Sequence, residues 1–109
     1  MGVMGEELQA IVAELRDHFE RLYGPRLVRL VLFGSQARGD AEPGSDIDVL
    51  IVLEGPVNAA AEAALTLDFR AELSLRYNTV VSCIFMDEER YRDRNGPLLR
   101  NIRREGIAV

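Results

Sequence analysis

The stretch that decides the fold reads GSQARGD (residues 34–40), then a short loop, then SDIDV (residues 45–49). The apolar run LVRLVLF (residues 27–33) leads into it, and VLIVL (residues 49–53) leads out of it. Runs of this length that are apolar on both faces are typical of strands inside a sheet. We therefore expect one strand that ends in a turn of small residues, and a second strand that opens with two carboxylates.

Asp46 and Asp48 are those two carboxylates. Residues two apart on a strand point to the same face, with Cα atoms about 6–7 Å apart. Anionic oxygen atoms at that separation suit one or two Mg²⁺ ions, or Mn²⁺, which takes the same ligands. The pair is the predicted metal site, although an Asp-x-Asp sequence alone also caps turns.

The Gly34–Ser35 turn is the predicted phosphate site. Backbone N–H groups in such a turn can surround a phosphate, and a Cβ at Gly34 would block the close approach of phosphate to backbone. Arg38 follows Ser35 by about one helical turn, and its charged guanidinium group can reach the same phosphates. Two other interpretations stay open here: Ser35 as a simple helix N-cap, and Arg38 as a surface ion pair.

Apolar periodicity and turn residues predict the other elements and the order α-β-β-α-β-α around a small mixed sheet. We expect a helix over 5–23, strands over 27–33 and 47–53, a loop over 34–45 with a helical turn near 35–38, a helix over 58–76, a strand over 79–86, a short polar helix over 87–94, a helix from Pro97 to Gly106 and an edge strand over 107–109. The expected core positions on the three longer helices are Leu8, Ile11, Val12, Leu15, Phe19 and Leu22, then Leu65, Phe69 and Leu73, then Leu98, Leu99 and Ile102.

Length and composition indicate one globular domain over residues 1–109, with 48% hydrophobic and 28% charged residues. The formal net charge of −5 argues against general nucleic-acid binding, which favours a basic surface. All thirteen basic residues are arginine, which excludes a P-loop lysine and a Schiff-base lysine. The single Cys83 excludes a disulfide framework and reads as a small buried hydrophobe. With no membrane-length apolar run and no secretory signal pattern, we expect a cytoplasmic protein without membrane contact.

Gly34-Ser35, ten residues, then Asp46-x-Asp48 resembles the signature of the nucleotidyltransferase superfamily that includes DNA polymerase β. The fuller string GSxARG…SDIDVLIV resembles the minimal nucleotidyltransferase (MNT) branch. The resemblance implies the nucleotidyltransferase fold, an α/β (α+β) architecture, and transfer of a nucleoside monophosphate from a nucleoside triphosphate, with ATP favoured. It also implies that Asp46 and Asp48 are catalytic and bind Mg²⁺, while Gly34, Ser35 and Arg38 bind the nucleotide.

The same resemblance suggests a partner. Many members of this branch resemble antitoxins that act on a helical HEPN-type toxin, some by adenylylating a tyrosine. Only about 23 residues follow the third strand, so we expect a partner or a second copy, as a homo-oligomer, to complete the site.

One departure from the family pattern leaves catalysis open. Active members carry a third carboxylate on the strand after the intervening helix, where this chain has Ser82. Asp87, Asp40 or Glu42 could substitute only if the backbone brings one of them into contact with the metal. The alternatives are an enzyme, a binding module that neutralises its partner by contact, and a regulatory nucleotide sensor.

Two further features have plain interpretations. The six arginines between residues 90 and 104 are typical of a solvated helix face, and a surface for a partner or for nucleic acid is the alternative. His18 lies beside an apolar stripe and far along the chain from the motif, which favours a boundary position.

Overall fold

Four strands form one mixed sheet, in the order β3-β2-β1-β4, in the computed structural model, which describes residues 5–42 and 45–109. β1 (Leu27–Phe33) is antiparallel to both β2 (Ile47–Leu53) and β4 (Ile107–Ala108). β3 (Val81–Asp87) is parallel to β2. The small mixed sheet and its edge strand are therefore confirmed.

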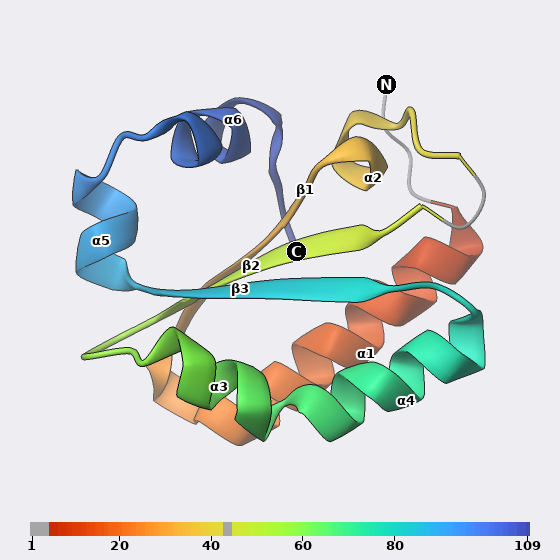
Figure 1. The fold of residues 1–109 in the computed structure, drawn as a ribbon, viewed down its shortest axis with the longest axis horizontal. Coiled ribbons are helices and arrows are strands. Elements are labelled where there is room, and N and C mark those ends of the chain that lie inside the picture. Colours follow the sequence, from red (N-terminus) through yellow and green to blue (C-terminus); the bar gives the residue numbers. More distant parts are fainter. Residues whose placement is uncertain (1–4, 43–44) are drawn as a thin grey trace.

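Helices cover both faces of this sheet (Figure 1). The elements in chain order are α1 (Glu6–Tyr23), a 3₁₀ turn (Gly24–Arg26), β1, α2 (Ser35–Arg38), β2, α3 (Ala59–Leu65), α4 (Leu67–Tyr77), β3, α5 (Glu88–Asp93), α6 (Pro97–Glu105) and β4. α1, α3 and α4 lie on one face and α6 on the other, while α5 follows the end of β3. Every helix in the described ranges is too short or too polar to cross a bilayer.

The second strand, β2, is the most deeply buried element. Residues 49–53 are at most 1% exposed. Val49, Ile51 and Leu53 join the core beneath α1 and α4, and the alternating residues Leu50 and Val52 join a second core beneath α6. This two-sided burial is what a run of consecutive apolar residues predicts, because successive side chains point to opposite faces.

The first helix was predicted correctly, with one wrong core position. α1 ends at Gly24, which has a positive φ of 53°. Leu22 is 39% exposed, whereas Tyr23 is buried and its hydroxyl donates to Glu62 at 2.8 Å. The polar end of Tyr23 has a partner inside the fold, so the aromatic ring takes the core position.

The single helix predicted over 58–76 is wrong, because the chain breaks at Thr66 into α3 and α4. The buried Thr66 hydroxyl donates to the carbonyls of Glu62 and Ala63, and Arg70 donates to the Ala63 carbonyl at 2.8 Å. These side-chain donors satisfy carbonyl groups at the end of α3, so the helix can end without an unpaired backbone group. Leu65 is consequently 62% exposed and not part of the apolar stripe.

Smaller differences concern element ends. β3 begins at Val81 and not at residue 79, and Leu98 is 44% exposed while Leu99 and Ile102 are buried. The helical turn over 35–38 and the short helix after β3 are confirmed. The predicted loop over 34–45 includes Pro43 and Gly44, which lie outside the described residues.

Candidate functional site

The end of β1 and the start of β2 bring the predicted phosphate turn and a predicted metal ligand into contact. In the β1–β2 register, Phe33 lies opposite Asp48, so Gly34 follows directly beside that carboxylate. A Cβ built on Gly34 would lie only 2.5 Å from Asp48 Oδ2. Gly34 also has a φ of +76°, which side chains with a Cβ rarely adopt. Glycine is therefore favoured at this position for two reasons, its positive φ and the lack of room for a Cβ. The atom that a Cβ would meet is Oδ2 of Asp48.

Asp46 and Asp48 differ in environment. Asp46 is exposed and directly precedes β2, whereas Asp48 is half-buried on the strand. Burial raises the pKa of Asp48, and repulsion from the Asp46 carboxylate raises it further. The two carboxylates therefore interact, as their spacing predicts.

This pair fits a divalent cation. No ion pair neutralises either carboxylate within residues 5–42 and 45–109. Those same residues contain no cluster of three or more acidic, histidine or cysteine side chains arranged for a metal. Two carboxylates alone would be compatible with Mg²⁺, which commonly takes its other ligands from phosphates and water.

Ser82 lies beside this pair. The parallel β2–β3 register places Ser82 next to Asp48, so the two side chains share the face of the sheet that α6 covers. A hydroxyl is a weaker metal ligand than a carboxylate, and Ser82 is half-buried in this position. The position nearest Asp48 on β3 therefore carries no charge.

The three proposed substitutes for a third carboxylate do not join the site. Asp87 lies opposite Leu53, five residues further along the strand or about 16 Å away, and its side chain caps α5 by accepting from Arg90 N–H at 2.7 Å. Asp40 accepts from Arg38, and the Glu42 side chain is exposed. The condition set for substitution by Asp87 is therefore not met, and Asp40 and Glu42 form no metal cluster with the pair among the described residues.

The small helix α2 positions the other predicted nucleotide ligands. Gly34 is its N-cap residue, so the interpretation of Ser35 as the N-cap is wrong. Ser35 is half-buried and is the first residue of the helix. Its backbone N–H therefore lies in the first turn, where N–H groups have no acceptor within the helix. Ala37 packs into the core and anchors the turn.

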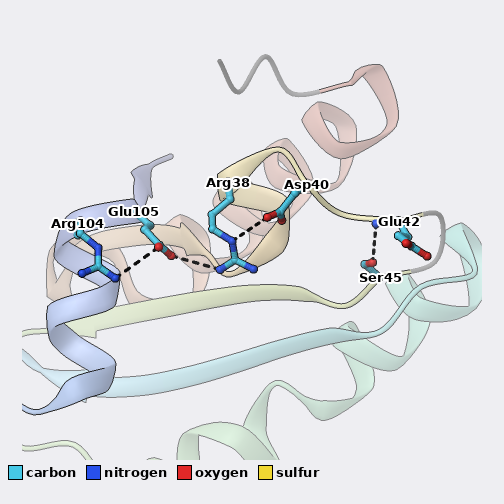
Figure 2. Close-up of polar contacts among 6 residues, drawn as sticks. All are labelled: Arg38, Asp40, Glu42, Ser45, Arg104 and Glu105. Atoms are coloured by element: carbon cyan, nitrogen blue, oxygen red, sulfur yellow. Dashed lines mark hydrogen bonds and ion pairs between the residues drawn. The ribbon is translucent and has the colours of Figure 1, made fainter.

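Arg38 extends from the end of α2 into a chain of ion pairs (Figure 2). Its Nε lies 3.2 Å from Asp40 Oδ2, and its Nη1 lies 3.2 Å from Glu105 Oε2. These hydrogen bonds, the one to Asp40 first, raise the pKa of Arg38 above its ordinary value. The ion-pair interpretation is thus correct.

Glu105 is the residue that sequence reasoning missed. It lies 67 residues beyond Arg38 in the chain, at the last turn of α6. The helix end at Gly106 was predictable, but the contact between the two chain segments depends on how β4 pairs with β1. No local pattern in the sequence carries that information.

Contacts within the fold are visible for several of the remaining candidate residues. The six arginines of residues 90–104 are all exposed, and Arg103 donates to the carbonyls of Tyr91 and Arg94, which ties α6 to α5.

His18 stacks on Phe69 with ring centroids 3.7 Å apart, at the α1–α4 boundary. Burial lowers the pKa of His18. Cys83 is a free thiol against the core, and burial raises its pKa to about 12.

Comparisons with known proteins agree on one family. A family model described as "Nucleotidyltransferase domain" matches residues 12–107. A relative from Methanocaldococcus jannaschii, "Putative protein adenylyltransferase", is 34% identical over 99 residues, which cover 90% of this chain and 93% of the relative.

Two solved structures share the fold at low sequence identity. A toxin–antitoxin structure with AMP-PNP is 20% identical with a TM-score of 0.60, and the match covers 95% of this chain and 72% of that one. A tri-AMPylated HEPN toxin in complex with its MNT antitoxin, from Shewanella oneidensis, contains a chain that is 18% identical with a TM-score of 0.56, over 92% and 69% of the two chains. Because the family model spans most of the sequence and a relative matches over nearly its whole length, this chain belongs to the nucleotidyltransferase domain family.

Proposed function

We propose that this chain is a Mg²⁺-dependent nucleotidyltransferase that binds ATP and transfers AMP to a protein, as the antitoxin partner of a HEPN-type toxin. The contact between Gly34 and Asp48 carries the proposal. A phosphate group seated on the Gly34–Ser35 turn would lie beside the carboxylates that are suited to a cation. Triphosphate and metal are thereby recognised at one place.

Each side chain has a defined task in this proposal. Asp46 and Asp48 hold Mg²⁺, and their mutual repulsion makes a cation favourable there. The ion, when bound, neutralises the triphosphate and helps to align it for displacement. The N–H groups of the turn and the Arg38 guanidinium bind the distal phosphates.

The reaction is an adenylyl transfer. A hydroxyl oxygen of the acceptor bonds to the α-phosphorus, the bond to the bridging oxygen of the β-phosphate breaks, and pyrophosphate leaves with the electron pair. The hydroxyl proton passes to solvent. Support for a protein acceptor comes from the relative named as a protein adenylyltransferase and from the AMPylated toxin complex that shares the fold.

Label transfer tests this function. The full chain is incubated with Mg²⁺, α-labelled ATP and a HEPN-type protein as the candidate acceptor. We expect label on that protein with α-labelled ATP and none with γ-labelled ATP. Asp48→Asn should abolish transfer while the protein remains folded. Failure of the wild-type chain to transfer label, despite binding ATP, would contradict the enzymatic proposal.

Ser82 favours a second candidate, a binding module that neutralises its partner by contact. With a hydroxyl next to Asp48, the site has one carboxylate fewer than the family's active pattern. The Asp46→Asn/Asp48→Asn double variant separates the two candidates. Neutralisation that persists in this variant supports the binding module, and neutralisation that disappears while partner binding persists supports the enzyme.

A further inference from the structure

Arg38 is held at two of its three guanidinium nitrogens. Nε donates to Asp40 and Nη1 to Glu105, both at 3.2 Å, as Figure 2 shows. Nη2 forms no hydrogen bond or ion pair with any residue in the ranges 5–42 and 45–109. The guanidinium is planar, so fixing two nitrogens also fixes the direction of the third.

Glu105 is itself fixed from its other side. Its Oε1 lies 3.6 Å from Arg104 Nη2, which also donates to Asn101 Oδ1 at 2.8 Å. The Glu105 side chain is 27% exposed, against 43% for Arg38 and 69% for Arg104. The least exposed member of this chain of ion pairs is therefore the carboxylate in its middle.

The backbone next to Glu105 leaves little freedom. A Cβ on Gly106 would lie 2.4 Å from the Ile102 carbonyl oxygen and 2.5 Å from Val31 Cγ1. The following residue, Ile107, pairs with Leu32 in the sheet. The close packing of Gly106 and the β4–β1 pairing together bring the end of α6 to the end of α2.

We infer that Glu105 is a positioning residue for triphosphate binding, which orients Arg38 and leaves Nη2 available to phosphate. This inference rests on the proposed function. Asp40 lies only two residues from Arg38, whereas Glu105 ties the guanidinium to α6, 67 residues further along the chain. Two arginines and two carboxylates make the cluster neutral in sum, so Glu105 orients the arginine without giving the cluster a net negative charge.

Nucleotide affinity measured by calorimetry with Mg²⁺ tests this role in the full chain. We expect Glu105→Gln to weaken ATP binding about threefold and Glu105→Ala about tenfold, because the amide keeps one acceptor for Nη1. AMP, which lacks the distal phosphates, should lose much less. Glu20→Gln is the matched control, since it removes the surface ion pair to Arg16 on α1 and should leave ATP affinity unchanged.

A double variant separates positioning from an independent effect. Arg38→Ala/Glu105→Ala should bind ATP no more weakly than Arg38→Ala alone, because Glu105 acts through Arg38. Additive losses, unchanged ATP affinity in both Glu105 variants, or tighter binding would each overturn the inference. If Glu105→Ala does not fold, the Gln variant decides. Absence of ATP binding by the wild-type chain would instead refute the proposed function.

Discussion

Replacing Asp48 by asparagine should stabilise the protein in the absence of metal. Asp48 is half-buried, its pKa is raised by burial and by the Asp46 carboxylate, and it has no ion-pair partner in the part of the chain that the structure describes. Asparagine has nearly the same shape and removes the charge. The variant therefore loses a repulsion and a desolvation cost without losing a known hydrogen bond.

The magnitude follows from the Cα separation of about 6–7 Å expected for residues two apart on a strand, taken as the order of the distance between the two charges. At about 6–7 Å, two unit charges repel by about 0.6 kcal/mol in a water-like dielectric and by about 2.5 kcal/mol at an effective dielectric of about 20. Asp46 is exposed, so we take a value near the lower end, about 1 kcal/mol. For a domain of 109 residues this corresponds to a rise in Tm of about 4 °C.

Thermal unfolding followed by circular dichroism measures the effect at neutral pH. In EDTA, Asp48→Asn should melt about 4 °C above wild type. Mg²⁺ at ten times its Kd should add about 1.4 kcal/mol to wild type and nothing measurable to the variant. Asp17→Asn, which removes an exposed partner of Arg21, is the control and should not raise Tm. A variant that melts at or below wild type in EDTA would refute the argument that these carboxylates repel each other.

Three further outcomes follow from the same contacts. Gly34→Ala should destabilise the fold by at least about 1 kcal/mol and abolish Mg²⁺-dependent ATP binding, because its Cβ meets Asp48; normal binding by calorimetry would contradict this. Ser82→Asp should tighten Mg²⁺ binding about tenfold by adding a charge beside Asp48, and unchanged affinity would argue against the register. His18 has a lowered pKa against Phe69, so the unfolded chain binds more protons. Wild-type stability in urea should therefore fall relative to His18→Gln as pH drops through about 6.5, and parallel curves would contradict this.

Local chemistry made the turn at Gly34–Ser35 and the second strand predictable. A glycine followed by a helical turn, and a run of consecutive apolar residues, impose their structure without reference to the rest of the chain. The break at Thr66 was not predictable, because it depends on side chains that donate to carbonyl groups within the folded helix pair. Periodicity alone describes such a stretch as one helix.

Which residues surround the site depends on how the strands pair, and this could not be predicted from local patterns. Asp87 and Ser82 lie on the same strand. The family resemblance pointed to Ser82 as the position of the third acid, and the pairing with β2 places Ser82 beside Asp48 and Asp87 far away. The contact of Glu105 with Arg38 likewise arises from the pairing of β4 with β1, across 67 residues. Long-range pairing decides these neighbours, and a single sequence does not encode it in any short pattern.

The burial of β2 has a consequence for how the molecule opens. Amide hydrogens in a strand whose side chains are covered on both faces exchange with solvent only when the whole domain unfolds, whereas α3, which has no buried residue, can exchange through local fraying. We therefore expect Asp48 to lie on the slowest-exchanging strand of the protein. Transient loosening of the outer helices should therefore leave the Asp48 carboxylate in place, ready for the cation that we propose it binds.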